Sequence, residues 1–207
     1  GVSLSTTFEK NDNKIPQLIT ECMKAVDARG MEFEGIYRKS GPMTQINRII
    51  ANANKGEVAD MTSDETFDIM AITSVLKQSL RELPGALLVG AFYKEWLDSA
   101  RLYSAVEQDE NDPNFIRRVD ATRELINKLP LQNRVVLALL MVHFNKVSTF
   151  SNVNLMYPSN IGVVLGPTLL KPASNNGDGS FTQQQSVLDV ADSGLKCSVI
   201  EFLVRNV

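Results

Sequence analysis

The chemistry in this sequence centres on an arginine between two glycines. Residues 34–41 read EGIYRKSG and lie between two stretches of helical apolar spacing. Glycine permits backbone conformations that other residues resist, so this segment is expected to form a shaped loop that presents Arg38. A guanidinium stays charged and offers several N–H donors, which suits it to stabilise negative charge on oxygen. From the residue type alone, a solvated surface charge is the commoner role for a loop arginine.

A second basic feature is the pair Lys77 and Arg81 in the segment LKQSLRELP, residues 76–84. Four positions of separation place both on one helical face, while the leucines occupy the other. Like charges at this spacing mildly disfavour a helix, which hints at an anionic surface or a structural partner. From the spacing alone, an amphipathic helix with a solvated cationic face is the better explanation.

A third segment, NLMYPSNIGVVLGPTLL at residues 154–170, combines helix signals with one polar residue. Pro158 suits the first turn of a helix, and the Gly166-Pro167 pair is expected to end that helix abruptly. Asn160 then lies early in a mostly apolar helix. From the pattern alone, it is expected to cap the helix or to form a local hydrogen bond.

Several kinds of catalytic site are missing from the sequence. No glycine precedes a lysine, so a Walker-type phosphate-binding loop is absent. One histidine and two distant cysteines do not make a zinc site. His143 lies in the middle of an apolar helical stripe, where a hydrogen-bonded core histidine is expected rather than a general base. The chain therefore has little material for a self-contained hydrolytic site.

Helices are expected to position these residues, because apolar side chains recur at helical spacing nearly everywhere. No convincing strand alternation occurs, so the predicted fold is all-α, a single domain of about eight or nine helices. The expected helical segments are residues 15–26, 46–53, 67–83, 87–97, 115–129, 135–147, 158–165 and 187–203.

Length and composition describe one ordinary globular domain. The chain has 207 residues, of which 43% are hydrophobic and 22% charged, and a domain of this size needs no metal or disulfide to hold it together. Polar loops expected at residues 108–114 and 173–180 are too short to be linkers, so one domain is expected over residues 1–207. The net charge of −3 argues against a nucleic-acid-binding protein.

The cysteines and the missing targeting signals bear on location. Cys22 and Cys197 lie in apolar helical patterns, where cysteine commonly acts as a small buried hydrophobe. The sequence has no secretory signal and no apolar run near 18 residues. These features predict a reduced, cytoplasmic domain. Because the chain starts at Gly1 without methionine, it is expected to be a piece of a larger multidomain protein.

In this order, the three segments resemble the sequence signature of RhoGAP domains. EGIYRKSG resembles the arginine-finger loop of that family, LKxxLRELP its second block, and NxMxxxNIGxVxGPxLL its third. A fourth stretch, residues 129–144, resembles the long helix that precedes the third block. The similarity extends over about residues 1–170 and implies the all-helical RhoGAP fold.

The resemblance also implies roles for four residues. Arg38 corresponds to the catalytic arginine finger. Lys77 and Arg81 correspond to the basic pair that supports the finger loop and contacts the GTPase, and Asn160 to the asparagine placed against the GTPase switch or nucleotide region. The chain departs from the family pattern at Leu155, where lysine is frequent, and at residues 85–86, where an acidic residue and a proline are common. These departures bear on partner preference or loop shape.

The implied function is stimulation of GTP hydrolysis by a Rho-family small GTPase (Rho, Rac or related), in signal transduction and cytoskeleton regulation. Such a domain is an activator that supplies one catalytic residue in trans, while the partner GTPase holds GTP and Mg²⁺. No cofactor or metal of its own is expected.

Two alternatives belong to other functional classes. A non-catalytic GTPase-binding or scaffold module can have the same fold. A lipid-binding helical domain would need a basic amphipathic helix, so direct membrane binding is not expected, and recruitment to membrane or cytoskeleton would depend on other parts of the full-length protein. A monomer is the default oligomeric state.

Overall fold

A computed structural model describes residues 4–10, 12, 14–62, 67–104, 108–173, 187 and 189–207 of the chain. All regular elements within these ranges are helices, which confirms the all-α prediction. The helices are α1 (Leu4–Lys10), α2 (Gln17–Arg29), α3 (Met43–Asn54), α4 (Ile69–Arg81), the 3-10 helix η1 (Gly90–Phe92), α5 (Tyr93–Leu102), α6 (Pro113–Lys128), α7 (Leu131–Thr149), α8 (Ser151–Asn154), α9 (Pro158–Leu169) and α11 (Ser193–Arg205).

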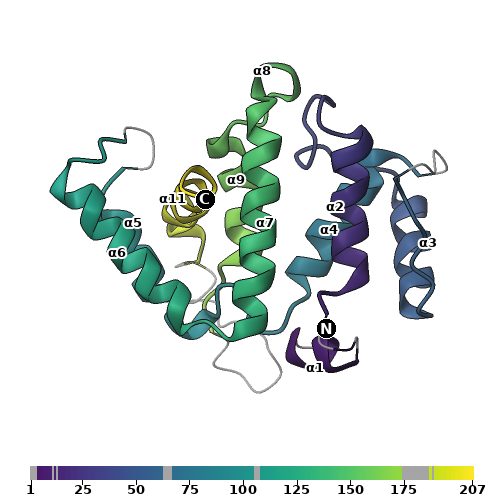
Figure 1. Cartoon of the computed structure of the whole chain (residues 1–207), viewed down its shortest axis with the longest axis horizontal. Helices are drawn as coiled ribbons and strands as arrows, with labels where there is room; N and C mark the ends of the chain where they lie inside the picture. Colours follow the sequence, from purple (N-terminus) through teal and green to yellow (C-terminus); the bar gives the residue numbers. More distant parts are fainter. Residues whose placement is uncertain are drawn as a thin grey trace.

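The long helix α7 crosses the middle of the molecule between two groups of helices (Figure 1). On one side α4 packs against both α2 and α3, and on the other α5 packs against both α6 and α11. Helix α9 joins the two groups, because it contacts α4 as well as α7 and α11. The loop between α2 and α3, which carries Arg38, lies at the same end of the molecule as α8 (Figure 1).

Aspartates and prolines mark where several helices begin. The Asp68 carboxylate accepts a hydrogen bond from the Met70 N–H at 2.7 Å, and Asp112 accepts one from Asn114 at the same distance. Each caps a helix N-terminus by satisfying an N–H group that has no partner within the helix. Pro113 and Pro158 occupy first-turn positions, where the missing N–H of proline costs no helical hydrogen bond.

Helix α9 is longer than the sequence predicted. The expected stop at Gly166-Pro167 is wrong, since α9 continues through Pro167 to Leu169. Proline so near a helix end removes only one hydrogen bond, and the Leu170 N–H still donates to the Gly166 carbonyl at 3.1 Å.

Other boundaries differ as well. The helix expected over residues 87–97 is a turn followed by η1, and α5 begins only at Tyr93. Ala86 and Val89 have positive φ angles of 62° and 53°, which a continuous right-handed helix does not allow. Residues 187 and 189–191 are helical, as expected, but a turn at Asp192 separates them from α11, which begins at Ser193. The loop expected at residues 173–180 lies outside the described residues except for Ala173.

The predicted buried positions are largely found in the core. Cys22 is completely buried, as expected, whereas Cys197 is only half-buried. Trp96 is also completely buried, and its indole N–H donates to the Leu88 carbonyl at 3.0 Å. In the described part of the chain, no helix has the length and apolar character needed to cross a membrane.

Two glycines let α9 and α11 approach closely. A Cβ atom on Gly162 would lie 2.5 Å from the Cys197 carbonyl oxygen, and one on Gly166 would lie 3.0 Å from the Cys197 nitrogen. The backbones of the two helices therefore touch with no room for a side chain. Through this contact α11 supports α9, which begins with the segment that carries Asn160.

Replacing Gly162 with alanine is expected to destabilise the protein by about 1 to 3 kcal/mol, because the added methyl group forces α9 away from α11. Urea unfolding measures the change in the free energy of unfolding. The matched control is Gly194→Ala, since a Cβ there meets nothing within 4 Å; alanine should stabilise α11 by about 0.5 to 1 kcal/mol. Equal stability of Gly162→Ala and the wild type would contradict the packing argument.

Candidate functional site

The Arg38 loop, residues 30–42 between α2 and α3, presents an unpaired guanidinium. The Arg38 side chain is exposed and makes no hydrogen bond or ion pair among the described residues. Its backbone is fixed, because the Arg38 and Lys39 N–H groups both donate to the Gly35 carbonyl, at 2.9 and 2.8 Å. The base of the side chain is thus held while its charged end remains free.

The conformation of Tyr37 sets the direction of Arg38. Gly35 and Tyr37 both have left-handed backbone angles, with φ of 73° and 66°. A tyrosine in this region costs about 1 to 2 kcal/mol, so other contacts must hold it there. Tyr37 is buried while Arg38, its neighbour, is exposed. The turn therefore directs one side chain into the core and the next one out of it.

The Tyr37 side chain is anchored in the core against α7. Its ring makes an edge contact with Phe144 at a centroid distance of 4.8 Å, and its hydroxyl oxygen lies 2.6 Å from His143 Nε2. Burial, reinforced by the nearby Cys22 and Asp27, raises the pKa of Tyr37 well above its ordinary value. The hydroxyl consequently keeps its proton at neutral pH.

His143 is a buried, hydrogen-bonded residue, as the sequence predicted. Its Nδ1 lies 3.2 Å from Asp27 Oδ1, an electrostatic contact rather than a well-aligned hydrogen bond. Lys146 Nζ lies 3.4 Å from the same oxygen. His143 is the main cause that lowers the pKa of Asp27, with Lys146 adding to it, against partial burial. The order of carboxylate, imidazole and hydroxyl is that of a hydrolytic triad, yet the Tyr37 side chain is sealed in the core and no substrate reaches its hydroxyl.

The opposite end of Tyr37 is held by α4. Lys77 Nζ donates a hydrogen bond to the Tyr37 carbonyl oxygen. Burial, with the neighbouring Arg81 charge, lowers the pKa of Lys77. The structure thus places Lys77 directly against the Arg38 loop. Tyr37 is clamped at its hydroxyl by α7 and at its carbonyl by α4.

Arg81 lies one turn further along α4 and is exposed. Its carbonyl oxygen accepts a hydrogen bond from Lys171, which follows α9. The pKa of Lys171 is lowered by burial and then by Arg81, against a smaller opposite effect of Asp189, so the charges of Lys171 and Arg81 are close enough to repel. No ion pair neutralises Lys77, Arg81 or Lys171 within the described ranges. The end of α4 is therefore locally cationic, and the sequence did not identify Lys171 as part of this cluster.

Asn160 lies in the first turn of α9 and is half-buried. Its Nδ2 donates to the Leu155 carbonyl oxygen at 2.7 Å, the local hydrogen bond that the sequence offered as one of two roles. Leu155 itself has a left-handed backbone, with φ of 59°, at the end of α8. Asn160 is joined to the Arg38 loop indirectly, through the backbone next to Leu155.

Asn154 provides that link, and sequence reasoning assigned it no role. It is completely buried, and its Nδ2 donates to the carbonyl oxygens of Met31 at 2.8 Å and Val147 at 2.9 Å. Its Oδ1 accepts from the Met156 N–H at 2.7 Å, and its own carbonyl accepts from the Gly35 N–H at 2.7 Å. One side chain and its backbone thus join the Arg38 loop, the end of α7 and the entry to α9. Its place at the start of the third segment was the available signal.

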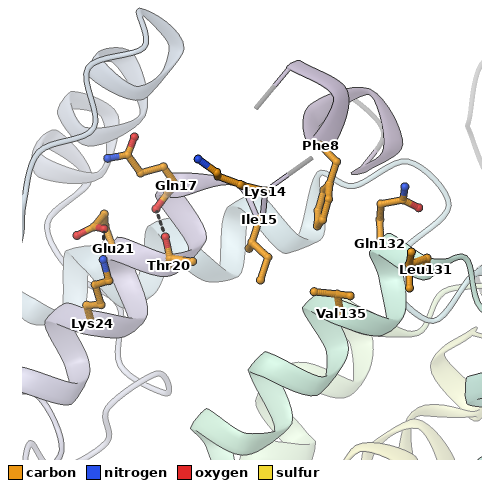
Figure 2. A pocket seen from close by; sticks show the side chains of 10 residues that line it. All are labelled: Phe8, Lys14, Ile15, Gln17, Thr20, Glu21, Lys24, Leu131, Gln132 and Val135. Atoms are coloured by element: carbon orange, nitrogen blue, oxygen red, sulfur yellow. Dashed lines mark hydrogen bonds and ion pairs between the residues drawn. The ribbon is translucent and has the colours of Figure 1, made fainter. Parts of the chain in front are cut away.

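A cavity of about 750 Å³ lies elsewhere, between the α1 region, α2 and α7 (Figure 2). Phe8, Ile15 and Val135 line its apolar part, and the ion pair between Glu21 and Lys24 lies at its edge. None of its lining residues belongs to the Arg38 loop, α4 or α9. Across the described residues, no group of three or more His, Cys, Asp or Glu side chains is arranged to hold a metal ion.

Comparison with known proteins gives consistent matches. A family model for the RhoGAP domain matches residues 16–174. Rho GTPase-activating protein 15 of Gallus gallus is 32% identical over 178 residues, which cover 86% of this chain and 35% of that protein. Rho GTPase-activating protein 26 of Homo sapiens is 33% identical over 192 residues, covering 91% of this chain and 21% of that protein. The chain thus spans about a third or less of the length of these relatives.

Two solved structures share the fold. The crystal structure of human Rho GTPase activating protein 15 superposes with a TM-score of 0.79 at 28% identity, covering 98% of this chain and 87% of that chain. The crystal structure of the BH domain from GRAF, the GTPase regulator associated with focal adhesion kinase, gives a TM-score of 0.70 at 31% identity, covering 91% of this chain and 90% of that chain.

Truncation of Asn154 is expected to loosen the Arg38 loop. Asn154→Ala leaves buried groups of Met31, Val147 and Met156 without partners, so the free energy of unfolding should fall by about 3 kcal/mol. The control is Asn152→Ala, an exposed neighbour in α8 that should change stability little. Urea denaturation compares the two, and equal losses would show that Asn154 does not have this role.

The contact between Asp27 and His143 predicts a pH-dependent contribution to stability. Because the folded-state pKa of Asp27 is lowered, the contact stabilises the protein above the unfolded-state pKa of about 3.9 and loses that effect as the pH falls through the lower folded value. Asp27→Asn should therefore be less stable than the wild type at pH 7, and the difference should shrink below about pH 4. Asp98→Asn, in an exposed pair with Arg101, serves as the control in unfolding curves at both pH values. A difference that does not vary with pH would refute this assignment.

Proposed function

The chain belongs to the RhoGAP family, and from that premise we propose that it stimulates GTP hydrolysis by a Rho-family small GTPase with Arg38 as its arginine finger. The family and its GTPase-activating relatives support the activating function. The observation that carries the residue assignment is the exposed, unpaired guanidinium of Arg38 on a loop whose backbone is held from two sides. The proposed domain covers residues 1–207, since α11 lies beyond the matched range and still packs on α9.

The proposed chemistry is stabilisation of charge in phosphoryl transfer. GTP hydrolysis proceeds through a loose transition state in which charge shifts onto the bridging and equatorial oxygens, so catalysis is mostly positioning and electrostatics. The partner GTPase would hold GTP and Mg²⁺ and orient the attacking water. Arg38 would add a planar cation with paired N–H donors, which can contact two oxygen atoms at once. This chain is then an activator that contributes one side chain, not an enzyme with a site of its own.

The geometry around Arg38 favours this use. Because the backbone at Arg38 is already ordered, docking has to restrict only the side chain, which lowers the entropic cost of reaching the active geometry. For the related Ras system, an arginine finger contributes about 10³- to 10⁵-fold in rate, which equals about 4 to 7 kcal/mol of activation free energy. That gain exceeds what ordering of exposed loops usually provides, so the guanidinium is expected to supply most of the rate enhancement.

The other three residues receive supporting roles in the proposal. The Lys77 ammonium group donates a hydrogen bond to the Tyr37 carbonyl oxygen, so Lys77 supports the loop. Arg81 is exposed at the cationic end of α4 and is free to contact an acidic surface of the GTPase. The Asn160 amide nitrogen donates to the Leu155 carbonyl oxygen, so the amide oxygen remains available to the GTPase.

Replacing Arg38 tests the assignment. Arg38→Ala should lower the stimulated rate of hydrolysis by about 10³-fold or more while the GTPase still binds. Arg38→Lys should restore little, because an ammonium lacks the forked geometry of a guanidinium. Single-turnover hydrolysis of GTP on purified Rho- and Rac-type GTPases measures the rate. Titration of the GTPase measures binding.

The matched control is Lys39→Ala, which removes an exposed neighbouring cation whose pair with Glu34 lies at the surface, and it should act like the wild type. An unchanged rate for Arg38→Ala would exclude Arg38 as the finger. A wild-type chain that binds the GTPase and accelerates nothing, with no aluminium fluoride-dependent complex on the GDP form, would instead identify a scaffold module.

A further inference from the structure

We propose that His143, oriented by Asp27, is a positioning residue for Arg38 and acts through its hydrogen bond to the Tyr37 hydroxyl. The inference rests on the proposed function, because it states how the arginine finger is held. It concerns a residue 106 positions away from Tyr37 in the sequence that is buried and so does not touch the presumed partner. It is not one of the four residues to which a role is assigned above.

Tyr37 controls the path of the loop because its backbone is left-handed and its side chain is buried. If the Tyr37 backbone relaxed to an ordinary negative φ, the chain would leave the turn in another direction. The two hydrogen bonds from Arg38 and Lys39 to the Gly35 carbonyl would then be lost. The guanidinium would start from a different point on the surface, and the side chain would have to be reordered on docking.

The hydroxyl of Tyr37 provides the polar anchor for its side chain. The ring packs edge-on against Phe144 and His143, with centroid distances of 4.8 and 5.7 Å, and such ring contacts are less directional than a hydrogen bond. The Oη–Nε2 contact at 2.6 Å is directional and lies in the core, where a lost partner leaves a buried polar atom unsatisfied. It is therefore the contact that selects one position of the ring.

Asp27 determines which way this hydrogen bond runs. Its carboxylate lies 3.2 Å from Nδ1 and favours a proton on that nitrogen. Nε2 is then the acceptor and the Tyr37 hydroxyl the donor. Lys146, which faces the same carboxylate at 3.4 Å, balances its charge at the surface. The anchor thus runs from α2 through α7 to the loop.

The expected kinetic signature follows from this arrangement. Arg81 and Asn160, the proposed GTPase contacts outside the loop, are not part of the anchor, so binding should persist when the anchor is removed. Removal of the anchor lowers the fraction of molecules in which the loop holds Arg38 in its active position. The maximal stimulated rate measures this fraction. Loss of one net hydrogen bond predicts about a tenfold decrease in that rate.

The central experiment compares Tyr37→Phe, His143→Leu and the double variant in the full chain. Each single variant should lower the maximal stimulated rate about tenfold and leave the half-saturating GTPase concentration unchanged. The double variant should be no worse than the single ones, because both changes remove the same contact. His143→Gln, which retains a hydrogen-bonding group, should recover part of the rate. Additive losses, no recovery by glutamine, or a change in binding alone would overturn the proposal.

Tyr103→Phe is the matched control. It removes a different tyrosine hydroxyl, one that accepts from the Asp109 N–H at 3.0 Å beyond the end of α5. This variant should stimulate hydrolysis like the wild type. Thermal unfolding confirms that each variant is folded at the assay temperature.

A second measurement needs no GTPase. Amide hydrogen exchange at Arg38 and Lys39, whose N–H groups donate to Gly35, should become about tenfold faster in Tyr37→Phe while exchange within α11 stays unchanged. Unchanged exchange at both amides would overturn the proposal even if Arg38 is the finger.

The two proposals can fail separately. A wild-type chain that stimulates no GTPase refutes the proposed function, whereas faster exchange in Tyr37→Phe would still show the anchor. In an Arg38→Ala background, Tyr37→Phe should change the residual rate no further, and a further loss would also count against positioning.

Discussion

The strained backbone of Tyr37 is the constraint on which the rest of the site depends. A bulky residue adopts a left-handed conformation only where surrounding contacts outweigh its cost. Here those contacts come from the core, through the ring and hydroxyl, and from Lys77, through the carbonyl. The strained residue directly precedes Arg38. The core contacts that fix the Tyr37 backbone therefore also fix the point from which the exposed Arg38 side chain extends.

The helical framework brings distant anchors to this loop. Lys77 comes from α4, His143 from α7 and Asn154 from the end of α8, and each contacts the loop through a polar atom. Buried polar groups of this kind are costly unless every one has a partner, and so they tolerate few alternative arrangements. The close packing of α9 on α11 at Gly162 has a similar effect, because backbone contact leaves little freedom for the helix that carries Asn160.

The end of α4 is a local cationic region in the described part of the molecule. The chain as a whole is acidic, with a net charge of −3, yet Lys77, Arg81 and Lys171 gather at the end of α4 without an acidic partner to form an ion pair among the described residues. The negative end of the α4 dipole offsets part of their repulsion. An anionic partner would be attracted to this region in particular, and overall charge alone would not have indicated it.

The sequence by itself determined the helical class, the approximate helix positions and the exposed loop around Arg38, because apolar spacing and glycine placement are local properties. It also predicted that His143 is a buried residue with a polar partner. Only the tertiary structure decided that the partners are Tyr37 and Asp27, that Lys77 reaches the Tyr37 carbonyl, and that Asn154 joins three segments. Periodicity shows which face of a helix is apolar but not which helix covers it, and these contacts join residues up to 123 positions apart. The continuation of α9 through Pro167 was likewise decided by packing, since contact with α11 outweighs the single hydrogen bond that proline removes.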